Sequence, residues 1–448
     1  MTDYLDRLAR AAYDVRLPDL PPSTVKAARL VLLDTIGAIV AGSALDENAR
    51  LARMAAARSP HGSATLIGHR HTSDALLATF TNATAGVALE MDEGNRLGGG
   101  HPAIHVVPAA LAVAEELSAD GARLLESVIA GYEVGSRLGG ATAARANVHS
   151  HGTWGTIGTA AAVARLHDLG ADEIRHVINL SASMSPANTW TPALEGATIR
   201  NAYPGRSGLE GILAIDLHRA GFTALDDAPS DVYGTILADR FDPREAVAGL
   251  GEGYRIEQNY FKFHACCRMN HPALDALMAL RVEAGIRADD VLGVEIVSIP
   301  FGLRMTEAAP RTMLAAKFSI PYAAAAALVL GRTDVAAFEE RLLDDPRIRA
   351  TAGRVAVKAD PEMALKRADY PTATVRVTLR DGRVLARETG VVRGDALNPV
   401  PPAEVVDKFL ALASGPLGAA RAREIVAAVE SVERLKDVRD LTARLRTG

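Results

Sequence analysis

The residues best suited to chemistry lie within the stretch 90–105. It holds three acidic side chains, three consecutive glycines and two histidines, His101 and His105. Pro102 suits the first turn of a helix, where its missing N–H is not needed, so His101 is expected at or near the N-cap. The free N–H groups and the positive end of the helix dipole favour a bound anion and a neutral imidazole, which accepts a proton. His101 is therefore a candidate acid or base.

Two later stretches repeat this layout. His149 begins one of them and is followed by several glycines and an apolar segment that is predicted to be helical. Arg200 belongs to the other, between Gly196 and Gly205, again ahead of a predicted helix. Glycines at such positions allow a ligand to approach the backbone closely. Since each of the three segments carries His or Arg, the sequence predicts a small anionic ligand.

Three further groups of residues are candidates. Asp92 and Glu93 follow the end of an apolar helix, where carboxylates are disfavoured unless a basic partner or a raised pKa compensates. A second polar cluster surrounds two adjacent cysteines at the predicted domain junction, a preferred place for a ligand cleft, and consists of Lys262, His264, Arg268 and His271. Tyr322 opens another predicted helix, where it is either a phenolic acid or a core aromatic residue.

Composition limits the class of protein. The 448 residues are 48% hydrophobic but only 4% aromatic, which predicts a well-packed protein whose helices rely on small aliphatic side chains. The net charge of -5 argues against a nucleic-acid partner. The adjacent Cys266 and Cys267 exclude a four-cysteine metal site within one chain and favour a reducing compartment. The apolar runs are too short to span a bilayer, so we expect a cytoplasmic protein with no membrane partner.

The spacing of apolar residues predicts a mainly α protein. Helical spacing dominates from residue 4 to about 260 and returns from 403 to 445. Between these regions, residues 291–299, 354–358 and 374–379 alternate in the manner of strands, and Asp381-Gly382 predicts a hairpin. We therefore expect a large all-helical domain, made of residues 1–264 and completed by residues 396–448, with a smaller α+β domain inserted at 265–395.

Taken together, these segments resemble the MmgE/PrpD family, which contains 2-methylcitrate dehydratase, cis-aconitate decarboxylase and iminodisuccinate epimerase. The resemblance covers nearly the whole chain, and its parts occur in the right order. They are Leu33-Asp-Thr-Ile-Gly, Asp92-Glu with His101-Pro and Val107-Pro-Ala-Ala, Ala130-Gly-Tyr-Glu-Val, residues 149–158, residues 196–205 with Ala220-Gly-Phe-Thr, residues 262–271 and Phe318-Ser-Ile-Pro-Tyr.

The resemblance implies a large helical domain, a smaller lid domain with the site between them, a homodimer, and no required metal or organic cofactor. The family's pocket residues correspond here to Asp92, His101, His149, Lys262 and Tyr322. A pocket lysine of the decarboxylase branch corresponds to Arg200, which keeps the positive charge but cannot change protonation state near neutral pH. Asn95 and Arg96 lie where other members often have threonine.

These observations lead to a functional hypothesis. We expect a cofactor-independent lyase, specifically a dehydratase of a small hydroxylated di- or tricarboxylate; a decarboxylase or an epimerase on the same scaffold is the alternative. His101 and His149 would exchange protons, Asp92 would orient a histidine, and Tyr322 would donate a proton. The residues predicted to bind substrate carboxylates or to stabilise the developing charge are Lys262, Arg200, Asn95, Arg268 and His271.

Three other interpretations use the same residues. His101 and His105 are four residues apart, as in helical metal-ligand pairs, and His149 with His151 would supply more nitrogen ligands. Cys267 with His271 would suit a hydrolase with a thiol nucleophile, although two plain buried cysteines fit equally well. A non-catalytic binding protein is the third interpretation.

Overall fold

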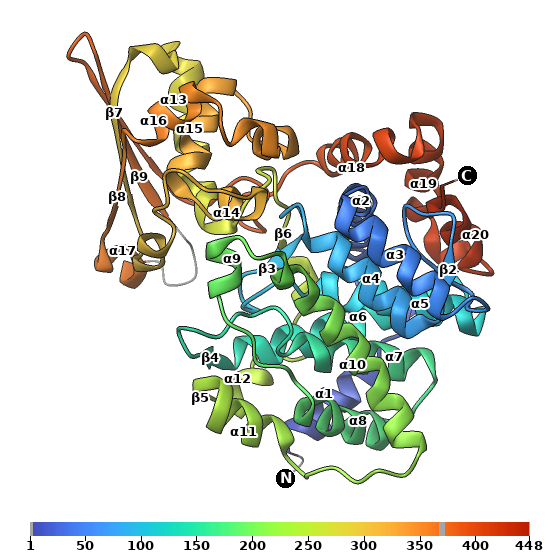
Figure 1. The fold of residues 1–448 in the computed structure, drawn as a ribbon. Helices are drawn as coiled ribbons and strands as arrows, with labels where there is room; N and C mark the ends of the chain where they lie inside the picture. The colour runs from blue at the N-terminus through green and yellow to red at the C-terminus, as the bar shows by residue number, and fades with distance from the viewer. Residues whose placement is uncertain (1–2, 367–371, 448) are drawn as a thin grey trace.

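The computed structural model describes residues 3–366 and 372–447 (Figure 1). A large helical part is joined to a smaller part that is built on one four-stranded sheet. The prediction of a mainly helical fold with a smaller α+β domain is therefore confirmed. The division at residues 264 and 395 stays a prediction.

Helices form most of the larger part. Its long N-terminal helices are α1 (Tyr4–Tyr13), α2 (Pro22–Ser43), α3 (Asp46–Arg58), α4 (Ala75–Val87), α5 (Pro102–Leu117), α6 (Gly121–Gly140), α7 (Gly155–Leu166), α8 (Ala171–Ser183) and α10 (Ala202–Arg219). The chain returns to this part through α18 (Pro402–Leu417), α19 (Ala419–Glu430) and α20 (Arg439–Thr442). Figure 1 shows α18 beside α2, and the two helices pack against each other.

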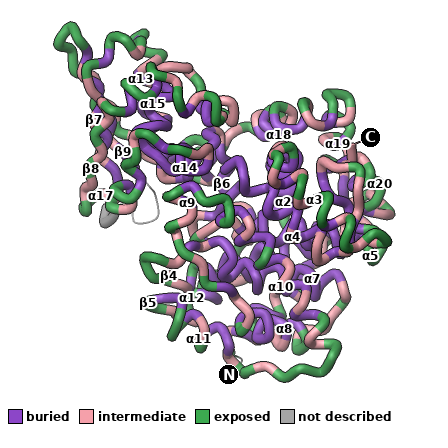
Figure 2. The backbone as a smooth tube through the Cα atoms, viewed as in Figure 1, coloured by how far each residue is buried: buried purple, intermediate pink, exposed green. Residues whose placement is uncertain are grey.

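Small residues bring these helices close together. A Cβ atom on Gly42 of α2 would lie 1.9 Å from the Ala85 carbonyl oxygen of α4, and one on Gly131 of α6 would lie 2.4 Å from the Gly158 oxygen of α7. Neither position accepts a larger side chain without moving a helix. The low aromatic content of the chain fits this dense packing, in which Figure 2 shows buried backbone through the middle of the helical part.

The smaller part contains a mixed sheet in the order β10-β9-β7-β8. Its strands are β7 (Val291–Ser298), β8 (Val355–Ala359), β9 (Ala373–Leu379) and β10 (Val384–Thr389). Only the β7–β8 pair is parallel, and the predicted hairpin joins β9 to β10 with Gly382 at a φ of +89°. Helices α13 (His271–Ala284) and α15 (Ile320–Leu330) pack against one face of the sheet and against each other.

Three two-stranded ladders also occur in or next to the helical part, where the sequence predicted helices. They pair β1 (Ala64–Thr65) with β2 (Thr72–Ser73), β3 (Gly94–Asn95) with β6 (Asn259–Tyr260), and β4 (Thr142–Ala144) with β5 (Ala238–Phe241). Strands of two to four residues are too short to show an alternating pattern. The β3–β6 ladder matters most, because it brings the stretch 90–105 beside the cysteine-containing cluster.

The described residues were also tested for membrane spans. Within them, no single helix is long and apolar enough to cross a bilayer. Helices α2 and α3 meet the length and composition requirements only as a pair, and they bend by 96° at their junction. Much of α2 is buried within the hydrophobic core of the helical part.

One buried ion pair ties the C-terminal helices to the site segment. Lys408 of α18 lies 2.6 Å from Asp34 of α2, and its ammonium donates a hydrogen bond to the Met91 carbonyl at 2.7 Å. Both side chains are at least 96% buried. Burial raises the pKa of Asp34, while the charge of Lys408 acts in the opposite direction.

We predict that Lys408→Ala destabilises the protein by about 3–5 kcal/mol, because Asp34 is left as an unpaired buried carboxylate. Urea unfolding followed by circular dichroism measures this change. The double variant Lys408→Met with Asp34→Asn should recover much of the loss, and Lys436→Ala, at an exposed lysine, should change little. A Lys408→Ala protein as stable as the wild type would show that the pair does not support the fold.

Candidate active site

A cavity of about 450 Å³ lies between the helical part and the sheet part. Its wall combines charged, aromatic and aliphatic side chains from segments that are far apart in the sequence. The lining residues are Glu90, Asn95, Arg96, Gly99, Gly100, His101, His149, Ser150, Trp190, Arg200, Tyr260, Cys267, Arg268, Met269, Ile299, Phe301 and Phe318.

His101 forms a dyad with a carboxylate at the start of α5. It occupies the N-cap position and is followed by Pro102 in the first turn, as predicted. Its Nδ1 lies 2.6 Å from the Glu93 carbonyl oxygen and 3.0 Å from Asp92 Oδ2. Both neighbours are acceptors, so Nδ1 carries a proton and donates it toward them. Nε2 is therefore the nitrogen left to exchange a proton with a molecule in the cavity.

A chain of buried ion pairs continues from this dyad. Lys262 Nζ lies 3.3 Å from Asp92 Oδ1 and 3.0 Å from Glu90 Oε2. Glu90 Oε1 in turn lies 2.5 Å from Arg200 Nη1. All four of these side chains are at least 98% buried, so each charge depends on its neighbours for compensation. The chain of charges thus links His101 to the Arg200 side of the cavity.

Two adjacent acids respond to this environment in opposite ways. Burial acts to raise the pKa of Asp92, but the charges of Lys262 and His101 outweigh it and hold that pKa below its usual value. Glu93 has no such cation, and burial raises its pKa to about 8. Its carboxyl group accepts hydrogen bonds from the Ala103 N–H at 2.7 Å and the Tyr132 hydroxyl at 3.1 Å. At neutral pH Asp92 is charged and Glu93 is mainly protonated.

The other histidines of the site form a stack beside His101. The ring of His151 lies between those of His101 and His149, with centroids 4.8 and 5.0 Å apart. His149 Nδ1 accepts the backbone N–H of His151 at 3.0 Å, so the neutral His149 ring carries its proton on Nε2. His105 accepts the Gly152 N–H at Nε2 and faces the His101 carbonyl through Nδ1. Burial lowers the pKa of His149, of His151 and, to about 4, of His105.

A second positive group lies at the opposite end of the cavity. Arg268 Nη2 donates to Asp395 at 3.0 Å, and its guanidinium stacks over the Tyr260 ring at 4.3 Å. Arg96 lies 3.8 Å from the same carboxylate. The buried Nη1 of Arg268 has no hydrogen-bond partner in the part of the chain that the structure describes. It is therefore a donor available to a bound anion.

The structure brings most of the predicted site residues together. His101, His149, Arg200, Asn95 and Arg268 line the cavity, and Asp92 and Lys262 lie directly behind its wall. The amide of Asn95 is committed to the protein: it donates to the Arg255 carbonyl at 2.7 Å and accepts the Gly98 N–H at 2.8 Å. Asn95 thus fixes the glycine loop, and its predicted contact with substrate is not supported by free hydrogen-bonding capacity.

Tyr322 and His271 lie elsewhere. The Tyr322 hydroxyl donates to the Ala337 carbonyl at 3.3 Å, and its ring packs near Phe338 in the core of the sheet part. His271 Nε2 contacts the Cys266 carbonyl at 3.2 Å. Neither residue is among the described residues that line the cavity. A proton-donating role for Tyr322 and a substrate contact for His271 stay predictions that this geometry does not support.

The cysteine pair does not form an activated nucleophile. Burial raises the pKa of the Cys267 thiol to about 11 and raises that of Cys266 further. The thiolate is the nucleophilic form, and at these pKa values it is scarce near neutral pH. The geometry therefore favours plain buried cysteines over the hydrolase interpretation.

Several glycines have a different role from the predicted one. A Cβ atom on Gly155 would lie 2.4 Å from the His105 ring, and one on Gly205 would lie 2.5 Å from the Phe80 carbonyl oxygen. These glycines allow helices to pack, and α7 and α10 begin at Gly155 and Ala202, several residues before the predicted starts. Only Gly99 and Gly100 of these segments reach the cavity wall.

One group of side chains has the donor types of a metal site. Single ligand atoms of Asp92, His101 and His151 lie within 4.8 Å of one another. However, the rings of the two histidines are nearly parallel, with planes 14° apart. Ring nitrogens bind metals in the plane of the ring, so two stacked imidazoles do not aim at a common point. Since His101 Nδ1 also faces two protein acceptors, these residues fit a hydrogen-bonded dyad better than a metal centre.

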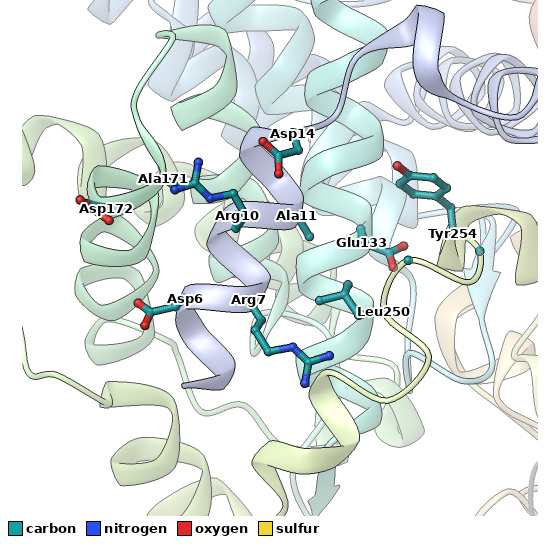
Figure 3. Close-up of a pocket in the computed structure, with 12 residues that line it drawn as sticks. Asp6, Arg7, Arg10, Ala11, Asp14, Glu133, Ala171, Asp172, Leu250 and Tyr254 are labelled. Carbon is teal, nitrogen blue, oxygen red and sulfur yellow. The ribbon is translucent and has the colours of Figure 1, made fainter. Parts of the chain in front are cut away.

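A larger cavity, of about 1010 Å³, lies far from these histidines (Figure 3). Figure 3 shows it between α1, which supplies Asp6, Arg7 and Arg10, and a loop that carries Leu250 and Tyr254. The described residues that line it include no histidine or cysteine. It therefore lacks a group suited to proton transfer at neutral pH, in contrast to the smaller cavity.

Comparison with known proteins agrees with the sequence resemblance. The MmgE/PrpD N-terminal domain matches residues 6–238, and the MmgE/PrpD C-terminal domain matches residues 264–434. The chain belongs to the MmgE/PrpD family. It is thus an enzyme of a family that acts on small carboxylates.

Curated relatives match over almost their whole length. A cis-aconitate decarboxylase-like protein of Aspergillus oryzae is 23% identical, with 96% of this chain and 94% of the relative covered. The cis-aconitate decarboxylase of Aspergillus terreus is 22% identical over 96% of this chain and 93% of its own. The human cis-aconitate decarboxylase is 23% identical over 98% and 94%, respectively.

Sequence reasoning missed several residues of this MmgE/PrpD site. Glu90, which pairs with both Arg200 and Lys262, was one of three acids in the first stretch but was not singled out. The aromatic residues Trp190 and Phe301 also reach the cavity. An acid next to Asp92 gave a weak signal for Glu90, whereas nothing in the local sequence of the aromatic residues relates them to the histidines.

The raised pKa of Glu93 predicts how stability depends on pH. Because the folded state holds this proton up to about pH 8, while the unfolded carboxyl has an ordinary pKa of 4.5, stability falls as pH rises between the two values. The loss is at most about 1.4 kcal/mol per pH unit. Glu93→Gln, which mimics the protonated acid, should remove this slope, and unfolding by urea at pH 5, 7 and 9 measures it.

Glu195→Gln, at an exposed carboxyl, is the matched control and should keep the wild-type slope. A Glu93→Gln protein whose stability changes with pH as steeply as the wild type would show that Glu93 is ionised in the folded enzyme.

Proposed function

We propose that the protein is a cofactor-independent lyase, specifically a dehydratase, that acts on a small hydroxylated carboxylate. The observation that carries this proposal is the His101–Asp92 dyad on the wall of a cavity with positive groups at both ends. A carboxylate-paired imidazole with its second nitrogen directed to substrate is suited to removing a proton from carbon. Membership of a family that acts on small carboxylates supports the same substrate class.

In the proposed reaction, Arg268 and Arg96 bind a substrate carboxylate at one end of the cavity. His101 Nε2 takes the proton from the carbon beside a carboxylate. Arg200, and Lys262 behind it, stabilise the negative charge that develops, and His149 donates a hydrogen bond from Nε2–H. The electron pair of the broken C–H bond then forms a C=C bond as hydroxide leaves the next carbon. The proton held by His101 passes to the hydroxide, so that water is released.

Decarboxylation is the second candidate, because the curated relatives are named cis-aconitate decarboxylases. It breaks a carbon–carbon bond and needs a proton donor for the resulting carbanion but no base. The dyad and the fixed charge of Arg200 favour dehydration, since both act on a proton-abstraction step. Epimerisation would use the same abstraction and return the proton to the opposite face. The homodimer and the cytoplasmic location stay predictions.

The test is incubation in deuterated buffer with citrate, 2-methylcitrate, malate, tartrate and cis-aconitate, followed by NMR. We expect an alkene product, or deuterium at the carbon beside a carboxylate, from one of the hydroxylated acids. Loss of carbon dioxide from cis-aconitate, without exchange in any hydroxylated acid, would replace the dehydratase by the decarboxylase.

For the accepted acid, His101→Gln should lower kcat/KM by about 10²- to 10⁴-fold, the usual contribution of a general base. Asp92→Asn should lower it in the same direction, because the ring loses the carboxylate that orients it. His61→Gln, at an exposed histidine, is the control and should leave kcat/KM unchanged. Full activity in His101→Gln would exclude this residue as the base.

We also predict that treatment with EDTA, followed by removal of the chelator, leaves the rate unchanged. The stacked rings of His101 and His151 are poorly aimed at a shared ion. The measurement compares initial rates before and after treatment, with metal content determined on both samples. A loss of activity that a divalent metal restores would establish the metal site instead.

A further inference from the structure

We propose that the substrate carries an apolar substituent, which binds to a hydrophobic wall opposite the histidines. The inference rests on the proposed function, because it specifies the substrate of the same cavity. The wall consists of Trp190, Ile299, Phe301, Phe318 and Met269, all of which line the cavity. We call these five residues the apolar wall.

The apolar wall is an ordered surface joined to the catalytic end. The rings of Trp190 and His149 are stacked with centroids 3.9 Å apart, and Phe301 meets Trp190 edge to face at 5.0 Å. Phe318 lies under the Arg200 guanidinium at 5.3 Å. A group attached to a carbon near His149 would therefore contact aromatic faces within the same cavity. Such contacts stabilise an alkyl or aryl group by removing it from water.

The size of the cavity supports this inference. Its volume of about 450 Å³ falls within the range of about 300–1,000 Å³ that is typical of pockets for drug-sized ligands. A compact acid held by Arg268 and reaching His101 would leave the apolar wall in contact with water. An apolar substituent would fill this space and exclude the water, which strengthens the interactions of the nearby charges.

The charges around the cavity limit the number of carboxylates. Its two charged groups contain four cations, Arg96, Arg200, Lys262 and Arg268, and three carboxylates, Glu90, Asp92 and Asp395. Glu93 is mainly protonated at neutral pH, since burial raises its pKa to about 8. The net charge of +1 suits a substrate with few carboxylates. A tricarboxylate would bring more negative charge than these groups offset.

The test compares malate with 3-methyl-, 3-isobutyl- and 3-benzylmalate. Each keeps a proton beside a carboxylate and a hydroxyl on the next carbon. Turnover is followed by NMR, and binding is measured separately by calorimetry. We expect affinity and kcat/KM to rise by about fourfold for each added methylene that becomes buried.

Phe301→Ala should weaken this dependence on the substituent, lowering the gain for the benzyl compound by tenfold or more. Leu303→Ala is the matched control, because Leu303 lies in the same short 3-10 helix, Pro300–Arg304, but is 51% exposed and does not line the cavity. It should keep the full wild-type dependence. Thermal unfolding of both variants verifies that they are folded.

The outcomes separate the inference from the proposed function. Turnover of malate with no gain from the substituents, or an equal loss for every acid in Phe301→Ala, would overturn the apolar subsite and leave the lyase standing. Tighter binding of the substituted acids with no reaction would support the subsite and refute the dehydratase. The absence of both binding gain and turnover would refute both.

Discussion

The structure depends on burying four alternating charges at the junction of its two parts. Arg200, Glu90, Lys262 and Asp92 are almost completely shielded from water, and removing any one would leave an uncompensated charge. They come from a helix end, a short 3-10 helix and the strand-like segment after Tyr260. Because the charges balance only when these segments meet, the cluster fixes the geometry of the cavity and the direction of the His101 ring.

Lysines from both parts hold the acidic segment in position. Lys408 donates to the Met91 carbonyl, and Lys317 donates to the Leu89 carbonyl at 3.1 Å and to that of Ala265 at 3.0 Å. Between these anchors, Leu89 and Met91 belong to the core of the sheet part, whereas Glu90 and Asp92 face the charged cluster. Glu90 adopts a φ of 56°, a conformation that is uncommon for a residue with a side chain. The backbone is thus held in an unusual turn at the point where the two parts meet.

The cavity combines two environments with different demands on a ligand. At one end, Arg268 and the His101 dyad offer directional hydrogen bonds, and Asp395 offsets part of the positive charge. At the other end, the apolar wall offers surface without hydrogen-bonding groups other than the Trp190 N–H. His149 belongs to both, since one face of its ring packs on Trp190 while its Nε2 lies near Arg200. The position of its ring therefore connects substrate size to the chemistry.

The sequence by itself determined the fold class, the hairpin at Gly382 and the start of α5 at Pro102, because these follow from local periodicity and turn chemistry. It also indicated His101, Asp92, His149, Lys262, Arg200 and Arg268, since polar residues in glycine-rich segments stand out locally. Only the tertiary structure decided that Glu90 bridges two cations, that Tyr322 lies in the core and that Trp190 faces His149. These are contacts between segments far apart in the chain, and their partners are set by packing, which local sequence does not specify.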